Sequence, residues 1–189
     1  MNAPTINAGK IIDRLVDLAP TIMEQYFRPD CCIAATRVAC GVIGRFGLPV
    51  FPQPTKLLVY TMPLWDRLNE WDGIYRKGEH SVGLGFGEDP RQKDPNWKGY
   101  AGHLVAMSQG RLIDLSFGQV SRPHKGINMP PAIAIPAPSF PLTGMLNGCM
   151  VQYRQHHNPK FTEAVDWTDV SRTSPIIRWL VNRIIEDGA

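Results

Sequence analysis

Apolar residues recur near a helical period in three stretches of the chain, which indicates three helices that each bury a face. Residues 9–27 have this spacing, with Pro20 as an internal break or a restart of the helix. Residues 31–46 are apolar nearly all round, which is typical of a buried central helix. Residues 175–186 form a closing helix with its apolar side chains on one inner face. Helices therefore occupy both ends of the chain.

Alternating and β-branched stretches predict strands in the middle of the chain. Gln109 and Gly110 separate two of them and form a plausible tight turn, so these two strands are expected to make a hairpin. The predicted strands cover residues 56–61, 80–86, 100–108, 111–117 and 149–156.

The remaining segments are less regular. A short helix is expected over residues 63–71, beginning at Pro63, and residues 89–99 are polar and loop-like. Residues 122–148 are rich in proline and glycine, so we expect an irregular segment that wraps the sheet or forms one lip of a cleft.

Helices first, then an antiparallel sheet, then a closing helix predict an α+β fold. A chain of 189 residues is long enough for one domain with a sizeable core. We expect a single domain over residues 1–189, with a helical part at 1–50, a sheet part at 55–160 and the closing helix at 175–186.

The charge balance argues against several classes of partner. The chain has 20 basic and 17 acidic side chains, a net charge of +3, and no basic cluster, so a nucleic-acid partner is not expected. No apolar run approaches the ~18–20 residues of a membrane span, and residues 1–10 do not resemble a signal peptide. The four cysteines include no Cys-x-x-Cys pair, so neither a disulfide framework nor a metal site is predicted. We expect a cytoplasmic protein without a cofactor.

The candidate chemistry lies in the order of a cysteine, a histidine and an aspartate. Cys32 opens the buried helix, His103 lies on the first hairpin strand and Asp114 on the second. Asp30 is the expected N-cap of the helix, and Gly47 follows its C-terminus. A thiol near a helix N-terminus, an imidazole base and a carboxylate that orients it can together activate a nucleophile. Backbone N–H groups around Cys32 would then serve as oxyanion donors.

Cys32, followed by Gly47-Leu48-Pro49-Val50, resembles the nucleophile helix of the transglutaminase-like, papain-fold superfamily. The segment from His103 to Gly118 is most similar to the arylamine N-acetyltransferase branch, although the chain is short for that branch. The resemblance implies a papain-like core in which Cys32 is the nucleophile, His103 the general base and Asp114 the orienting carboxylate.

Other residues compete for these roles. Cys31 is a rival nucleophile, because Gln25 precedes it at a spacing like that of the oxyanion glutamine in papain-like proteases. His80 is a rival base. Trp97 and Tyr100 are usually core or rim residues, but they are candidates for lining an acyl-acceptor groove. Residues expected to be structural or solvated are Cys40, Cys149, His124, His156 and His157.

The sequence therefore predicts a cysteine-dependent acyl-transfer enzyme that works through a thioester on Cys32. The acceptor is an amine in a transferase, or water in an amidase or peptidase, and the substrate is a small-molecule or peptide amide or acyl compound. A lip from Met129 to Phe140 that excludes water would favour transfer. The alternatives are a binding or scaffolding domain with a vestigial triad and, more weakly supported, an effector that modifies a host protein.

Overall fold

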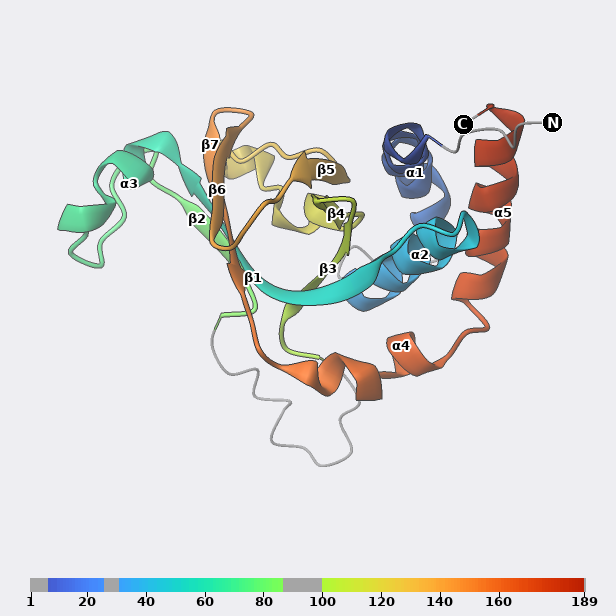
Figure 1. The fold of residues 1–189 in the computed structure, drawn as a ribbon. Helices are drawn as coiled ribbons and strands as arrows, with labels where there is room; N and C mark the ends of the chain where they lie inside the picture. Colours follow the sequence, from blue (N-terminus) through green and yellow to red (C-terminus); the bar gives the residue numbers. More distant parts are fainter. Residues whose placement is uncertain (1–6, 26–30, 87–99, 189) are drawn as a thin grey trace.

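A computed structural model describes residues 7–25, 31–86 and 100–188. Figure 1 shows a strongly curved sheet on one side and helices α1, α2 and α5 together on the other. The helices are α1 (Ala8–Met23), α2 (Cys32–Arg45), α3 (Met62–Asp66), α4 (Val165–Thr168) and α5 (Thr173–Glu186). The strands are β1 (Phe51–Thr61), β2 (Ser81–Leu84), β3 (His103–Ser108), β4 (Arg111–Asp114), β5 (Ile133–Pro136), β6 (Leu142–Leu146) and β7 (Cys149–Gln155).

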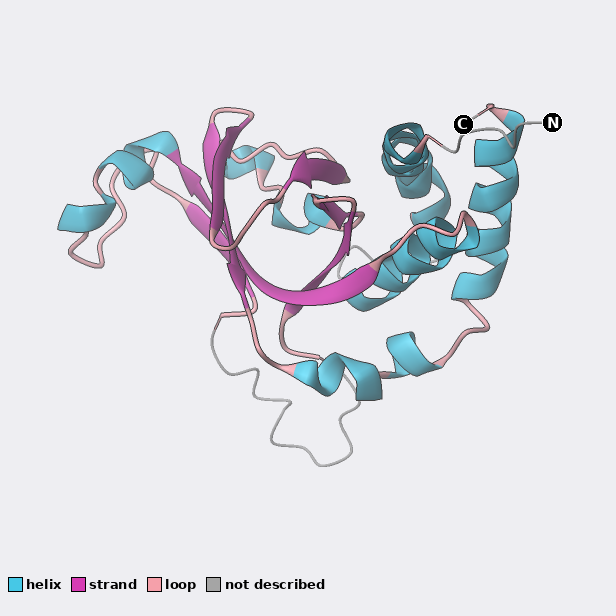
Figure 2. Cartoon of the chain, in the orientation of Figure 1, coloured by secondary structure: helices cyan, strands magenta, loops and turns pink. Residues whose placement is uncertain are grey.

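The seven strands of the described chain form one antiparallel sheet that curves into a half-barrel (Figure 2). Its order is β5-β4-β3-β1-β7-β6, and β2 pairs with the second half of β1. The mixed helix and sheet composition agrees with the predicted α+β class. Within the described ranges, no helix is both long enough and apolar enough to span a membrane.

Strand β1 is longer than predicted and begins at Phe51 rather than at residue 56. Pro52 and Pro54 concealed this first half, because proline removes a backbone donor and usually ends a strand. Here β1 is paired with β3 on one side, while its pairing with β7 begins only at Thr55. Proline is tolerated where a strand has an open side, so the extended backbone continues through both residues.

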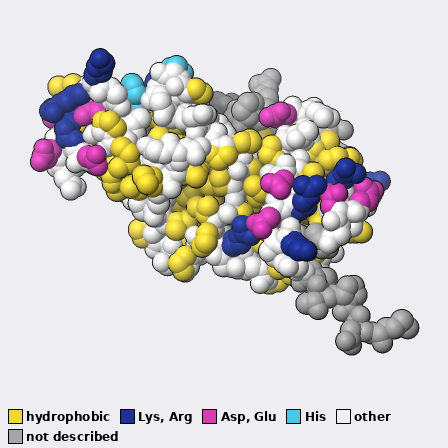
Figure 3. Space-filling view, turned by 90° about the horizontal axis from the view of Figure 1, so that it is seen from above, with side chains coloured by type: hydrophobic (Ala, Val, Ile, Leu, Met, Phe, Trp, Pro, Cys, Tyr) yellow, Lys and Arg dark blue, Asp and Glu magenta, His cyan; other side chains and the backbone are white. Residues whose placement is uncertain are grey.

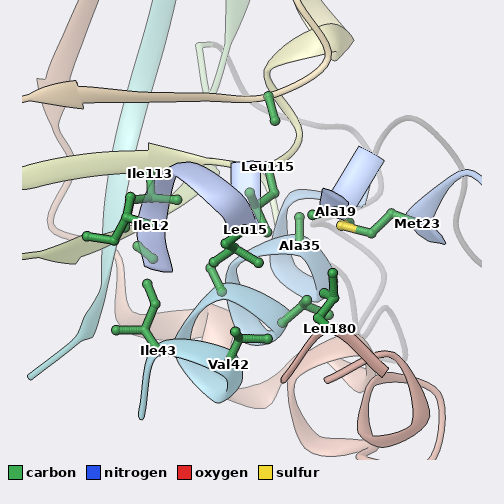
Figure 4. Packing of buried hydrophobic residues seen from close by; sticks show 14 of the residues in the cluster. Ile12, Leu15, Ala19, Met23, Ala35, Val42, Ile43, Ile113, Leu115 and Leu180 are labelled. Atoms are coloured by element: carbon green, nitrogen blue, oxygen red, sulfur yellow. The ribbon is translucent and has the colours of Figure 1, made fainter. Parts of the chain in front are cut away.

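Helices α1, α2 and α5 pack their apolar faces together and against the outer face of the sheet. Figure 4 shows Leu15 of α1, Val42 of α2 and Leu180 of α5 pointing into the same cluster. Ile113 of β4 and Ala106 of β3 contribute the sheet side of this cluster. Full burial of a leucine, valine or isoleucine side chain contributes ~1.5–3 kcal/mol, so this contact fixes α2 on the sheet.

The inner face of the half-barrel forms a second apolar core. Val105, Leu112 and Tyr153 belong to it, and they come from three different strands. A mainly apolar cavity of about 190 Å³ lies between β5 and β6 on this side. Seen from above, the molecule groups hydrophobic side chains across its middle, with charged side chains of both signs toward its ends (Figure 3).

Helix α1 is continuous through Pro20, so the predicted break there is wrong, and it ends at Met23 with Glu24 and Gln25 outside the helix. The end of the predicted helix, residues 26 and 27, lies outside the described residues. Proline cannot donate to the carbonyl four residues earlier, yet Ala19 and Met23 on either side of it are buried. The packing of these two side chains compensates for the missing hydrogen bond, so the last turn of α1 stays helical. Asn7 caps the first turn by accepting a hydrogen bond from the N–H of Lys10 at 3.1 Å.

The C-terminal end of α2 confirms the role predicted for Gly47. Gly47 has φ +72°, and its N–H donates to the carbonyl of Gly44 at 3.0 Å. The N–H of Leu48 donates to the carbonyl of Ile43 at 3.4 Å, which completes a Schellman motif. At the other end the N-cap is Cys31, with no side-chain cap, and the predicted cap Asp30 lies outside the described residues.

The segment 122–148 is more regular than predicted, because it contains β5 and β6. Its prolines suggested an irregular segment, but β5 and β6 are the edge strands of the sheet, where proline is tolerated. Asn147 and Gly148 join β6 to β7 with φ of 48° and 74°. Asn-Gly is a strong hairpin signal that indicates the second hairpin.

The hairpin turn predicted at Gln109 and Gly110 is confirmed, with φ of 53° and 69°. The closing helix is confirmed and begins two residues earlier than predicted, at Thr173. The returning strand is confirmed as β7, and the expected helix over 63–71 divides into α3 and a 3₁₀ turn at Leu68–Glu70. The predicted loop at 89–99 lies outside the described residues.

Candidate active site

Cys32 is the first residue of α2 and is buried, with 6% of its surface exposed. Its Sγ lies 3.8 Å from the carbonyl oxygen of Gly102, directly before β3. The first N–H groups of a helix have no acceptor within the helix and, with the helix dipole, favour negative charge nearby. The thiol therefore lies where a thiolate or an oxyanion is stabilised.

His103 and Asp114 face each other across the hairpin of β3 and β4. Ala106 pairs with Ile113, so continuation of the register places Val105 opposite Asp114 and His103 one diagonal step away on the same face. The imidazole Nε2 and the carboxylate Oδ2 are 2.6 Å apart. Both side chains are 0% exposed, so the pair is screened from water.

Asp114 also accepts hydrogen bonds from its other neighbours. The hydroxyl of Tyr153 donates to Oδ2 at 2.8 Å, while the N–H and hydroxyl of Ser116 donate to Oδ1 at 2.9 and 3.0 Å. Burial raises the pKa of the carboxyl, but the charge of His103 and these hydrogen bonds outweigh burial and hold the pKa below its usual range. The carboxylate is therefore kept ionised and fixed in orientation.

The same contacts act on His103 in the opposite direction. Burial lowers the pKa of the imidazole, but the charge and hydrogen bond of Asp114, together with the adjacent Cys32, raise it above its ordinary value. Since Nε2 is bound to Asp114, Nδ1 is the nitrogen left to act, and it is buried without a hydrogen-bond partner. A nearby thiol is the group from which such a nitrogen could accept a proton.

Aromatic side chains surround the thiol on the side of α4. Phe161 lies edge-on to Tyr100 at 6.1 Å and edge-on to Trp167 at 5.0 Å between ring centroids. Ile33 and Leu104 complete the apolar cluster around Cys32. An apolar surrounding of this kind excludes water and strengthens electrostatic interactions at the thiol.

The rival residues do not form a comparable arrangement. Gln25 is exposed, while Cys31 is half-buried at the N-cap of α2. His80 stacks on Tyr75 with ring centroids 6.5 Å apart. The backbone of His80 contacts Thr61, whereas His103 pairs with Thr55, and six residues of strand separate these positions by about 20 Å.

The structure tests the residues that were expected to be structural or solvated. Burial raises the pKa of the Cys40 thiol to about 12, and the Cys149 thiol contacts the carbonyl of Gly126 at 3.6 Å. His124 and His157 are exposed, as predicted. The prediction that His156 is solvated is wrong, because this residue is half-buried and its Nδ1 is enclosed without a partner.

Two further predictions about the rim of the site have different outcomes. Trp97 lies outside the described residues, whereas Tyr100 does lie in the cluster around Cys32. The expected lip from Met129 to Phe140 contains edge strand β5, whose Ile133 pairs with Asp114. Met129 and Ile133 are buried in the inner core, so this part of the segment contributes to that core.

Tyr153 and Ser116 were not predicted as site residues. Tyr153 comes 39 residues after Asp114, and its apolar pattern is that of any half-buried strand. Ser116 was predictable, because an Asp followed two residues later by a serine is typical of an Asx turn, in which the backbone N–H of the serine donates to the carboxylate. Among the described residues, no three His, Cys, Asp or Glu side chains are grouped to hold a metal ion.

The site is thus a buried thiol at a helix start beside an imidazole–carboxylate pair. No protein-family model, curated protein or solved structure matches this chain. Its chemistry is therefore inferred from the atoms of the site.

Proposed function

We propose that this chain is a cysteine-dependent acyl-transfer enzyme in which Cys32 is the nucleophile, His103 the general base and Asp114 the orienting carboxylate. The observation that carries the proposal is the state of His103. Its Nε2 is bound to Asp114, and its buried Nδ1 has no partner although Cys32 is adjacent. A structural histidine in a core normally has both ring nitrogens satisfied, since an unpaired buried polar atom costs free energy.

The proposed reaction has two halves. Nδ1 of His103, whose raised pKa favours the protonated imidazole, holds the proton taken from the Cys32 thiol, and the Cys32 sulfur attacks the acyl carbon as a thiolate while the electron pair of the carbonyl moves to oxygen. When the carbonyl re-forms, the leaving group departs with the proton from His103 and leaves a thioester on Cys32. An amine or water then gives a proton to His103 and attacks the thioester, and the thiol is regenerated.

We also propose that the core is papain-like in the broad sense of the transglutaminase-like superfamily. Its support is the arrangement of the three residues on the fold. The nucleophile opens a buried helix that packs against an antiparallel sheet, and two neighbouring strands of that sheet hold the histidine and the aspartate. The curvature of the sheet brings Tyr153 of β7 to the same carboxylate.

The substrate class that suits the site is an apolar acyl compound, either a small molecule or a peptide amide. Phe161, Trp167 and Ile33 provide apolar and aromatic contacts around the thiol. The guanidinium of Arg37 lies 5.9 Å from the ring centroid of Trp167, at the edge of this cluster. Acyl groups with an aromatic or aliphatic body are therefore expected to be transferred faster than charged ones.

The proposal is tested by the pH dependence of iodoacetamide labelling, with fragment mass spectrometry that separates Cys31 from Cys32. We expect Cys32 to react fast near neutral pH and to become slow in His103→Gln. Asp114→Asn should slow it as well, whereas Cys31→Ala should leave the rate on Cys32 unchanged. Circular dichroism of each variant separates loss of the fold from loss of activation. Slow labelling of Cys32 in the wild type, indifferent to His103, would contradict the proposal.

A binding domain with a vestigial triad remains the second candidate function, and one observation favours it. Cys32 is buried, and its thiol contacts a backbone carbonyl, as in a structural cysteine. If this candidate holds, Cys32 reacts slowly with iodoacetamide, and Cys32→Ala retains the full biological activity of the protein.

A further inference from the structure

A second polar atom near Cys32 is buried without a partner, namely the hydroxyl oxygen of Tyr100. Tyr100 packs against the cluster around the thiol, and Nδ1 of the adjacent His103 is another buried atom without a partner. Folding leaves few such atoms, because each loses its hydrogen bonds to water without replacement. Nδ1 of His103 faces the thiol whose proton it takes, so the hydroxyl of Tyr100 is the group left to complete its hydrogen bonds with a substrate.

The position of Tyr100 is fixed by its neighbours. Its ring and hydroxyl occupy the space that a Cβ atom of residue 102 would need, so they lie directly over the backbone of Gly102. The Sγ of Cys32 contacts the carbonyl of the same residue at 3.8 Å. Phe161 also contacts the tyrosine ring edge-on. The hydroxyl and the thiol therefore share Gly102 as their common neighbour.

The electrostatics of Tyr100 also favour donation of a hydrogen bond. Burial and the neighbouring Cys32 both raise the pKa of its hydroxyl. The hydroxyl therefore keeps its proton over the range in which a cysteine enzyme works. A neutral, preorganised O–H group in an apolar surrounding is a strong donor to a negative charge that develops nearby.

We propose that Tyr100 is an oxyanion donor, whose hydroxyl hydrogen-bonds the oxygen of the tetrahedral intermediate formed on Cys32. This inference rests on the proposed acyl-transfer function and adds a catalytic residue to it. As the sulfur–carbon bond forms, the carbonyl π pair becomes an oxyanion, which accepts hydrogen bonds from Tyr100 and from the N–H groups of the first turn of α2. When the carbonyl re-forms and the leaving group departs, both bonds weaken again.

Two probes of Cys32 separate this role from activation of the thiol. Iodoacetamide is attacked at a saturated carbon and forms no oxyanion, whereas p-nitrophenyl acetate is attacked at a carbonyl and does. In Tyr100→Phe we expect iodoacetamide labelling of Cys32 to stay within about twofold of the wild type. Release of p-nitrophenolate should fall about 100-fold, as is typical when one oxyanion donor is removed.

Tyr60→Phe is the matched control, because Tyr60 is also buried but packs against Trp65, with ring centroids 5.6 Å apart. Both rates should be unchanged in it. Stability gives a further readout, since Tyr100→Phe removes an unpartnered hydroxyl and should retain or raise the denaturant midpoint.

Each other outcome overturns a different statement. An equal fall in both rates of Tyr100→Phe, or a shifted pH profile of labelling, would mean that the hydroxyl acts on the thiol and not on the oxyanion. Unchanged rates with both probes would show that it has no role in the reaction. Slow labelling of the wild type would instead overturn the proposed function.

Discussion

The imidazole Nε2 of His103 and the carboxylate Oδ2 of Asp114 lie 2.6 Å apart, and neither side chain is exposed to water. Oδ2 of Asp114 also accepts a hydrogen bond from the hydroxyl of Tyr153. Removal of a charged member from such a buried network leaves its partners without compensation, so the network links the stability of the fold to the state of the site.

Asp114→Asn removes this charge at nearly constant volume. We expect the free energy of unfolding to fall by about 3–5 kcal/mol, because a buried imidazole loses its counter-charge. Labelling of Cys32 by iodoacetamide should slow in the same variant. Urea unfolding measures the first effect.

Glu186→Gln is the control for loss of a carboxylate, because its ion pair with Arg183 is exposed. Its stability should change by less than about 1 kcal/mol. Equal losses in Asp114→Asn and Glu186→Gln would contradict a special role for the buried pair.

The raised pKa of His103 predicts a pH dependence of stability. The folded protein binds a proton on His103 more tightly than the unfolded chain does. This contribution is fully present below about pH 6.5, the ordinary histidine pKa, and is lost as pH rises through the raised pKa of the folded state. The free energy of unfolding should therefore fall between about pH 6.5 and pH 10, by at most ~1.4 kcal/mol per pH unit for one proton.

The comparison that isolates this effect is His103→Gln, measured by urea unfolding over the same pH range. The variant is expected to be less stable overall, so the quantity to compare is the slope of unfolding free energy against pH. A wild-type slope equal to that of the variant would show that His103 does not contribute. On the acid side, Asp114 acts in the opposite sense: its lowered pKa gives stability above about pH 3.9 that is lost as pH falls through the folded value.

Tyr153→Phe should destabilise the protein by about 1.5–3 kcal/mol, since it deletes one hydrogen bond to a buried carboxylate while the ring remains. Tyr75→Phe deletes a hydroxyl that contacts Ser81 at 2.7 Å at an exposed position, so its cost should be small. Urea unfolding of both variants measures the difference. Equal costs would mean that the bond between Tyr153 and Asp114 does not help to hold the carboxylate.

The pairing of His103 with Asp114 was predictable because it is local. The turn at Gln109 and Gly110 sets the hairpin register, and the alternation of strand residues then places both side chains on one face. Tyr153 reaches Asp114 only through the pairing of β7 with β1, and no local pattern encodes that contact. The order of strands that are distant in the sequence therefore cannot be predicted from local sequence patterns.

The missed strands have a related cause. Pro52 and Pro54 in β1, and Pro136 in β5, removed the ordinary signal of a strand, because proline lacks the N–H of a ladder bond. Whether a proline is tolerated depends on whether its strand has an open side, which is a property of the assembled sheet. The Asn147-Gly148 pair is the local signal from which β6 was predictable, because it favours a tight hairpin turn.

The contact between α2 and α5 gives the last prediction. A methyl group added at Gly41 would collide with the side chain of Ile177, so Gly41 allows close approach of the two helices. Gly41→Ala gains up to about 1 kcal/mol of helix propensity but overpacks the interface at a cost of about 1–3 kcal/mol. We expect a net loss of stability, measured as a lower urea midpoint.

Gly44→Ala provides the matched control in the same helix, because its new methyl group would meet only the Cγ1 of Val50, at 4.0 Å. This variant should be more stable than the wild type by up to about 1 kcal/mol, since it gains helix propensity without a collision. Ile177→Val removes the terminal methyl group with which the methyl group added in Gly41→Ala would collide. The double variant Gly41→Ala/Ile177→Val should therefore recover part of the lost stability. If both glycine variants are stabilised alike, the close approach of α2 and α5 does not depend on Gly41.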